Sequence, residues 1–316
     1  KINMNRILTS SVRSVCNSKT LFGRRSTKGV RNYASMQDLK LRIGVVESVE
    51  KITSSMKMVS AAKLKVAQGH VDPAVRFFES TKRVFTDLEA DPEALKDLQA
   101  EATSDADAPH MIVAITTDRG LCGAITSNVC RVAVEQAKTH RKENVVFSSL
   151  GTKGQDNLVG QNQKKKLSLI VADLHVKQPS FAEVAYIADT ILARNISGIT
   201  VIYNHFVNML TNEMRVVKFL SIDELKSASK WQETEFDGED AFQSLNEFYF
   251  ASALWAAILD NSCCEQAVRM TAMDGASSNA ADLVESLSLE YNKTRQAAIT
   301  TELSEIVGGM AAILEN

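Results

Sequence analysis

The chain has 316 residues, of which 45% are hydrophobic and 23% charged, so its composition is that of a folded protein and not of a disordered or collagen-like chain. This length suggests about two domains. Only four prolines and 14 glycines occur, and aromatic residues make up 6%, a balance that favours long helices. No run of 18 apolar residues is present, and we therefore expect no membrane-spanning segment.

The formal net charge of −2 is unevenly distributed along the chain. Residues 1–34 contain eight Lys or Arg and no acidic residue, which leaves 28 basic against 38 acidic residues for the rest. An acidic body argues against a nucleic-acid-binding protein.

The basic segment at 1–34 is also rich in Ser and Thr and lacks the apolar stretch of a secretory signal. This composition is typical of an organelle transit peptide, which we predict for residues 1–34. The alternative is a solvated basic tail.

A helix is predicted from Met36 to about Phe85, because apolar residues recur there at steps of three and four. The predicted seam consists of Leu39, Ile43, Val46, Val49, Ile52, Met56, Val59, Ala62 and Val66. Pro73 is expected to kink or interrupt this helix. Residues 86–109 are predicted to form a short helix and an acidic linker.

The middle of the chain changes to short β-branched runs separated by helical stretches. Strands are predicted at 111–118, 144–151 and 167–176, helices at 124–138 and 180–193, and a hairpin from 199–206 and 214–222. Residues 223–240 are polar and loop-like. Strands that alternate with helices indicate an α/β domain whose sheet is mostly parallel with an antiparallel edge.

From about Asp240 to Ile313 no proline interrupts a helical pattern. A helix of about 70 residues would be about 105 Å long, too long to bury its apolar seam in one globular domain. We therefore predict an antiparallel coiled coil with the N-terminal helix, and a Rossmann-like α/β domain inserted between the two. The predicted boundaries are 1–34 for the transit peptide, 35–90 and 240–316 for the two helices, and 91–239 for the α/β domain.

Motifs for catalysis, cofactors or metals are absent from the sequence. No phosphate loop, G-x-S-x-G elbow or H-E-x-x-H occurs, and the five histidines are scattered. The five cysteines form no zinc spacing and are expected to be buried thiols. The turn at 118–123 follows a strand and precedes a helix, but it lacks G-x-G-x-x-G and reads more simply as a tight turn. We predict no catalytic, cofactor or metal site.

Several longer motifs resemble, in the same order, those of the gamma subunits of F-type ATP synthases, over essentially all of residues 36–316. In chain order they are Lys51-Ile52-Thr53, Met56-Lys57-Met58-Val59, Ala61-Ala62-Lys63, residues 117–123, residues 269–280, Thr294-Arg295-Gln296-Ala297 and residues 299–309.

The resemblance implies a non-catalytic rotor shaft that couples proton flow to ATP synthesis. The terminal helices would enter a ring of alternating catalytic (beta) and non-catalytic (alpha) subunits. The α/β domain would lie near the delta and epsilon subunits and the membrane c-subunit ring. Plastid members of the family carry an insert with a cysteine pair, which is not seen between 206 and 245. The resemblance and the transit-like start together imply a peripheral position on the matrix side of the mitochondrial inner membrane.

The same resemblance implies contacts with loops of the catalytic subunits. These are carried over to Arg269, Arg295, Gln296, Thr300, Glu302 and Glu305. Met56 and Lys57 of the N-terminal helix are expected opposite the final turns that carry Glu302 and Glu305. Arg295 is the strongest candidate, because a guanidinium can bind a carboxylate bidentately. For each residue the alternative is a solvated or seam position.

Two other functions stay open at this point. The α/β domain could bind a nucleotide at Gly120–Gly123 as an enzyme, although no acid, base or nucleophile set supports this. The chain could also be a passive coiled-coil tether, which would tolerate Arg295→Ala.

Overall fold

A computed structural model describes residues 36–88, 109–139, 145–161, 166–174, 178–194, 196–219 and 239–314. The predicted transit peptide and most of the predicted linker and 223–240 loop lie outside these residues. The described chain falls into two compact units. The smaller unit combines the start of the first helix, up to Arg42, with the end of the last helix, from Ser288 onward, and the larger unit is Ile43–Leu287.

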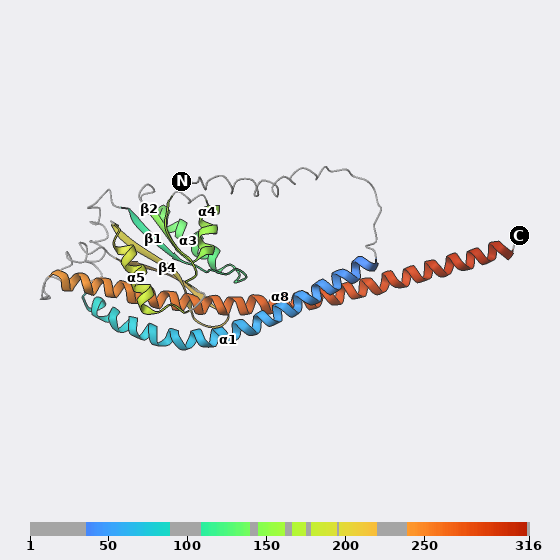
Figure 1. Cartoon of the computed structure of the whole chain (residues 1–316), viewed down its shortest axis with the longest axis horizontal. Helices are drawn as coiled ribbons and strands as arrows, with labels where there is room; N and C mark the ends of the chain where they lie inside the picture. Colours follow the sequence, from blue (N-terminus) through green and yellow to red (C-terminus); the bar gives the residue numbers. More distant parts are fainter. Residues whose placement is uncertain are drawn as a thin grey trace, which may run out of the picture. The chain divides into compact units, whose positions relative to one another are not determined.

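Two helices dominate the structure, α1 at Met36–Leu88 and α8 at Glu239–Leu314 (Figure 1). Both helices are as predicted, but the predicted seam of α1 is wrong, because Val49, Ile52, Val59 and Val66 are exposed. The expected interruption at Pro73 is wrong, because α1 continues through this residue. Pro73 is on the exposed side, whereas the neighbouring Val71 and Ala74 are buried and hold this turn of the helix in place.

Within the larger unit α1 and α8 pack antiparallel, as predicted. Lys57 pairs with Asp274, and farther along α1 the ring of Phe78 stacks on that of Tyr249, so residue numbers rise on one helix as they fall on the other. The shared core consists of small and branched side chains: Leu64, Ala67, Val71 and Ala74 of α1 with Leu259, Cys263 and Ala267 of α8.

The inserted domain contains a five-stranded sheet in the order β3-β2-β1-β4-β5. Its strands are β1 (His110–Ile115), β2 (Val145–Leu150), β3 (Leu167–Val171), β4 (Gly198–Phe206) and β5 (Asn212–Phe219). The first four strands are parallel, and β5 pairs antiparallel with β4 at the edge. This confirms the predicted parallel sheet with an antiparallel hairpin.

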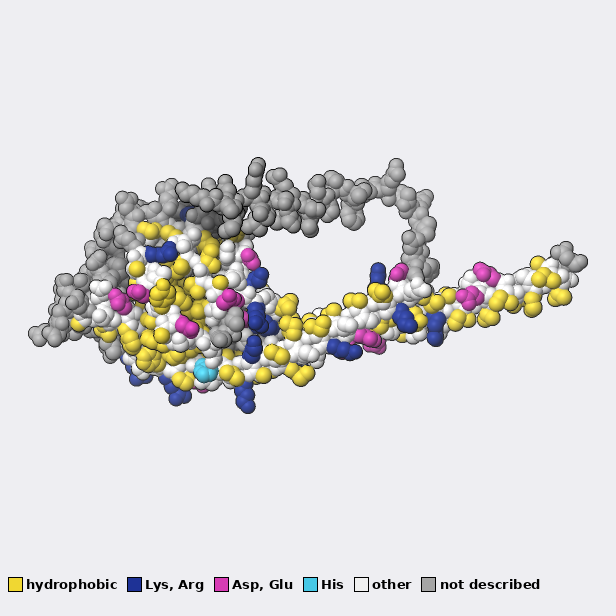
Figure 2. Space-filling view, viewed as in Figure 1, with side chains coloured by type: hydrophobic (Ala, Val, Ile, Leu, Met, Phe, Trp, Pro, Cys, Tyr) yellow, Lys and Arg dark blue, Asp and Glu magenta, His cyan; other side chains and the backbone are white. Residues whose placement is uncertain are grey.

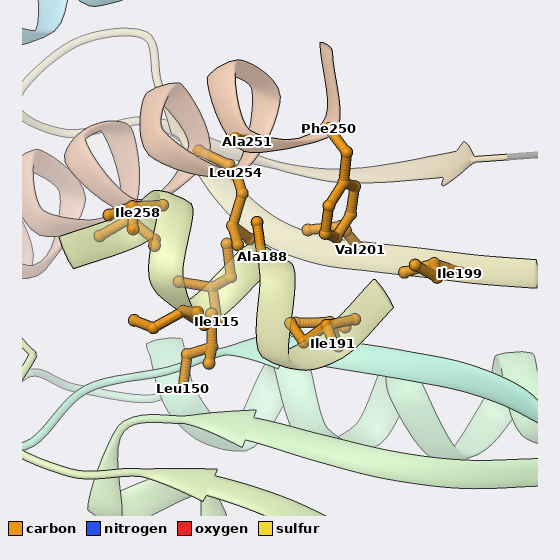
Figure 3. Packing of buried hydrophobic residues seen from close by; sticks show 14 of the residues in the cluster. Ile115, Leu150, Ala188, Ile191, Ile199, Val201, Phe250, Ala251, Leu254 and Ile258 are labelled. Carbon is orange, nitrogen blue, oxygen red and sulfur yellow. The ribbon is translucent and has the colours of Figure 1, made fainter. Parts of the chain in front are cut away.

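Helices cover both faces of the sheet, so its central strand is apolar at successive positions. Ile112 and Ala114 of β1 face α3 (Ile125–Thr139) and α4 (Thr152–Gly160). Met111, Val113 and Ile115 face α5 (Phe181–Leu192) and α8 instead. In Figure 3 Leu254 and Ile258 of α8 approach the sheet beside Ala188 of α5. The same stretch of α8 thus serves both the helix pair and the core of the domain.

Helix α4 is not anticipated by the sequence patterns, because its nine residues include two glycines and an asparagine that disfavour helix. The Gly151-Thr152-Lys153-Gly154 stretch is the start of this helix. Gly154 is needed for close packing, since a Cβ there would lie 2.4 Å from Thr116 Oγ1.

The four described cysteines are free and buried, as the sequence led us to expect. Burial raises the pKa of Cys130 and of Cys263 to about 12, so neither forms the reactive thiolate near neutral pH. We expect native chain treated with iodoacetamide at neutral pH to leave both thiols unmodified, and unfolded chain to react at both. Mass spectrometry of the alkylated peptides tests this, and rapid native labelling of Cys130 would contradict it.

Candidate functional site

The turn after β1, residues 116–123, is fixed by its own polar groups. Leu121 and Gly123 both have positive φ, at 63° and 60°, which reverses the chain direction within a few residues. The Thr117 hydroxyl donates to the Arg119 carbonyl at 3.1 Å and shares a 2.9 Å hydrogen bond with the Thr126 hydroxyl on α3. The turn is therefore tied directly to the helix that follows it.

Asp118 lies at the carboxyl edge of the parallel strands, where doubly wound domains bind phosphates. Its Oδ1 accepts the backbone N–H of Thr152 at 3.0 Å, at the start of α4, and that of Asp173 at 3.2 Å. A helix N-terminus offers such amides to anions, and here the anion is the carboxylate of the chain itself. This arrangement disfavours the nucleotide-binding interpretation of the turn.

No group of three His, Cys, Asp or Glu side chains that could hold a metal occurs among the described residues.

Arg269 of α8 is buried, with its side chain only 8% exposed, and its partners are internal. The guanidinium donates to Glu265 Oε1 at 2.5 Å, to Gln266 Oε1 at 3.3 Å and to the Gly120 carbonyl at 3.4 Å. It thus joins α8 to the turn after β1. Its predicted contact with a partner subunit stays a prediction.

A second polar junction joins β4 to α8. His205 Nδ1 lies 2.6 Å from Asp260 Oδ2, and the Phe206 amide donates to Asp260 Oδ1 at 2.8 Å. Beside them the Asn204 amide nitrogen donates to Asn261 Oδ1 at 3.0 Å. Burial is the largest influence on Asp260 and raises the pKa of its carboxyl despite the bond to His205.

Ionisation of Asp260 therefore costs the folded chain more than the unfolded chain. Its contribution to stability is present below the ordinary pKa of 3.8 and is lost as pH rises through the higher folded pKa. We expect Asp260→Asn to remove this loss, so that the free energy of unfolding declines less with rising pH above about pH 4 than in the wild type. Urea unfolding of both chains across this range tests it, and parallel curves would contradict it.

Five of the predicted contact residues lie near the end of α8. Arg295, Gln296, Glu302 and Glu305 are exposed, and Thr300 is exposed with its hydroxyl donating to the Gln296 carbonyl at 2.9 Å. Their side chains are open to a partner, and the contacts themselves stay predictions.

Met56 and Lys57 of α1 are half-buried and belong to the unit formed by Ile43–Leu287. Lys57 Nζ lies 2.7 Å from Asp274 Oδ1, so it faces a part of α8 well before Arg295. The expected place of these two residues opposite the final turns of α8 is wrong, because the register of the two helices sets Lys57 against Asp274.

The end of α8 is apolar and uncovered by the chain itself. Exposed large side chains there are Ile299, Leu303, Ile306, Val307, Met310, Ile313 and Leu314. Figure 2 shows hydrophobic side chains along these last turns. By length and composition α8 could cross a membrane, since one 18-residue window has a mean hydropathy of 1.4 and no buried residue. An apolar helix end that a partner protein covers has the same length and composition.

Comparison with known proteins covers nearly all of the described chain. The family model described as ATP synthase matches residues 35–313. The mitochondrial ATP synthase F(1) complex subunit gamma of Dictyostelium discoideum is 31% identical over 90% of this chain and 93% of its own length. The ATP synthase gamma chain of Erythrobacter litoralis is 33% identical over 89% of this chain and all of its own.

Solved structures agree with these relatives. The central stalk and c-ring structure of the Tetrahymena thermophila mitochondrial ATP synthase contains a chain 27% identical to this one, with a TM-score of 0.59 over 72% of this chain and 99% of that one. A chain of the Euglena gracilis mitochondrial ATP synthase shares the fold, with 21% identity and a TM-score of 0.69 over 88% of this chain and 94% of its own. The chain therefore belongs to the gamma-subunit family of the F-type ATP synthases, the non-catalytic subunits that form the rotary central stalk.

Proposed function

We propose that α1 and α8 form the shaft that turns inside a ring of alternating catalytic beta and non-catalytic alpha subunits, and that proton flow through the membrane sector drives the turning. The observation that carries this proposal is the uncovered apolar end of α8, with seven large apolar side chains exposed from Ile299 onward. Such a surface is unfavourable in water and stable inside a protein sleeve.

Rotation of this shaft can act on the catalytic subunits only if its faces differ. A protein shifts the equilibrium of its partner only through contacts that differ between the partner's states. At 3.6 residues per turn, Ile299, Ile306 and Met310 lie on one side of the last turns of α8, whereas Thr301, Ser304 and Gly308 lie on the opposite side. Each orientation would thus present a different set of groups to a given catalytic subunit.

The remaining partners are proposed for the α/β domain, namely the delta and epsilon stalk subunits and the c-subunit ring. Support comes from relatives found in structures described as central stalk with c-ring and as F1 with c-ring. We further propose a peripheral position on the matrix side of the mitochondrial inner membrane, because several relatives are mitochondrial and residues 1–34 have a transit-like composition.

Affinity purification of the tagged chain from its own cells tests this assignment. We expect the catalytic and non-catalytic ring subunits, the stalk subunits and the c subunit to co-purify, and mitochondria to contain the tagged chain. Recovery without ATP synthase subunits would refute the proposal.

Arg295→Ala tests the proposed contact at the end of α8. Loss of a bidentate guanidinium–carboxylate contact is expected to lower ATP synthesis by the assembled complex about tenfold, without loss of assembly. Lys293→Ala is the matched control, because it removes an exposed cation from the same stretch of helix. Equal rates for both variants and wild type would contradict the role of Arg295 and favour a passive tether.

A further inference from the structure

A cluster of aromatic rings joins the later part of α1 to the α/β domain within the larger unit. This ring cluster consists of Phe77 on α1, Phe181 on α5, and Phe248 and Trp255 on α8. The ring of Phe77 lies edge-on to the other rings, with centroid distances of 6.4 Å to Phe181, 5.8 Å to Phe248 and 6.3 Å to Trp255. Such near-perpendicular pairs are the favoured geometry of aromatic contacts. Figure 1 shows α5 where α1 runs beside the first turns of α8.

Phe181 is held in place by the start of α5. Ser180 and Glu183 form a capping box, in which the Glu183 amide donates to Ser180 Oγ at 3.3 Å and the Ser180 amide donates to Glu183 Oε2 at 2.8 Å. Just before them, Trp255 Nε1 donates to the Pro179 carbonyl at 3.4 Å. The chain on both sides of Phe181 is thus fixed, so the domain sets the position of this ring.

The seam between α1 and α8 away from the rings is of a different kind. It consists of small and branched side chains, for example Ala67 and Ala74 of α1 in one cluster with Ala267 of α8. Apolar contacts have little directionality, so they resist separation better than sliding. The Lys57–Asp274 ion pair is exposed, and exposed ion pairs contribute little. Edge-to-face rings, by contrast, prefer a specific mutual angle and therefore resist rotation of α1 about its own axis.

We propose that the ring cluster is the contact by which the α/β domain turns α1 together with α8, and that Phe181 is its positioning residue. Helix α8 has a firm connection of its own, because Leu254 and Ile258 lie in the core cluster of the domain. Among the described residues, that core cluster contains none from α1. Without the ring cluster, torque on the domain would therefore act mainly on α8. This role rests on the proposed rotary function.

The ring cluster lies at the surface, so its rings can be replaced without emptying the core. Phe77 and Phe248 are each 41% exposed, and Phe181 is half-buried. Loss of one ring opens the cluster to water and leaves no closed cavity, which limits the cost to the fold. Tyr186 offers a matched control, because it is an aromatic residue of the same helix with a side chain that is 74% exposed.

Hydrogen exchange of the assembled complex tests the contact directly. We expect amide protection in residues 72–80 of α1 to fall about tenfold in Phe181→Ala, with unchanged protection in β1. Phe77→Ala removes the contact from the side of α1 and should lower the same protection. Adding Phe181→Ala to it should cause little further loss, because both residues act in one contact. Wild-type protection of 72–80 in both single variants, or additive losses in the double variant, would overturn the proposal.

Conservative variants separate the ring from its apolar bulk. Phe181→Tyr keeps the ring and should retain wild-type protection, whereas Phe181→Leu keeps apolar volume without a ring edge and should show the loss. Tyr186→Ala should reproduce the wild-type profile. Equal protection in Phe181→Leu and wild type would show that edge-to-face packing is not needed, and would overturn the role of the ring.

The torque role needs a measurement under load. With an uncoupler present, ATP hydrolysis by the Phe181→Ala complex should equal that of wild type, whereas protons pumped per ATP against a gradient should fall. Phe181→Tyr and Tyr186→Ala should pump as wild type does. Unchanged pumping in Phe181→Ala despite lowered protection would overturn the role in torque transfer. Failure to recover the chain with ATP synthase subunits would instead overturn the proposed assembly, and the ring contact would still be measurable by exchange in the purified chain.

Discussion

Replacing Arg269 by alanine is expected to lower the free energy of unfolding of the chain by about 3–5 kcal/mol. The substitution leaves the Glu265 carboxylate, whose side chain is 2% exposed, buried without its counter-ion. Glu265 Oε2 already has no hydrogen-bond partner among the described residues, so nothing else in that part of the chain compensates the lost charge. The Gly120 carbonyl also loses a donor. Urea unfolding of the purified chain measures the loss.

A paired variant distinguishes two causes of the lower free energy of unfolding: a buried charge left unpaired, and the loss of side-chain packing. Arg269→Met with Glu265→Gln removes both charges and keeps similar volumes, and we expect it to recover most of the stability. Comparable losses in the single and the paired variant would contradict this explanation. If Arg269 also touches a catalytic subunit, the paired variant should remain folded while ATP synthesis by the complex stays impaired.

The architecture is the part of this protein that its sequence predicts best. The periodicities in the two terminal stretches differ from those of the middle, and the length of the C-terminal helix requires a partner along its seam. These features depend on local sequence pattern and on elementary helix geometry, so they can be predicted from a single sequence. The buried face of α1 was not predicted correctly: Val49, Ile52 and Val66 of the expected seam are exposed. Leu64, Ala67 and Val71 pack against α8 instead.

Other features depend on distant residues meeting, and the sequence alone does not reveal them. Helix α4 forms against its local propensity because Leu158 is buried under the sheet. The hydrogen bonds that the amides of Thr152 and Asp173 donate to Asp118 join residues that are far apart in sequence. The same holds for Lys57 and Asp274, whose pairing depends on the exact register of two long helices. Family resemblance supplied candidate contact residues, but it did not show that Arg269 would be occupied internally.

Gly151→Ala is the second substitution with a large expected effect, because two independent costs add at this position. Gly151 has φ of 119° and ψ of 139°, a conformation that is essentially restricted to glycine. A Cβ there would also lie 2.9 Å from the Thr116 carbonyl carbon and 2.9 Å from the Thr117 oxygen, and backbone atoms cannot rotate away. Strain and overpacking together predict a loss of about 2–6 kcal/mol.

The effect of Gly151→Ala should reach the turn after β1, because Gly151 packs against Thr116 and Thr117 at the start of that turn. Displacing Thr116 and Thr117 would weaken the hydrogen bond that the Thr152 amide donates to Asp118 and loosen the end of β1. Gly160→Ala at the other end of α4 is the matched control, since a Cβ there meets nothing within 4 Å. Its expected effect is a stabilisation of about 0.5–1 kcal/mol, from the lower entropy of the unfolded chain. Urea unfolding of both variants measures the contrast, and a small loss for Gly151→Ala would mean that α4 can shift away from β1 at little cost.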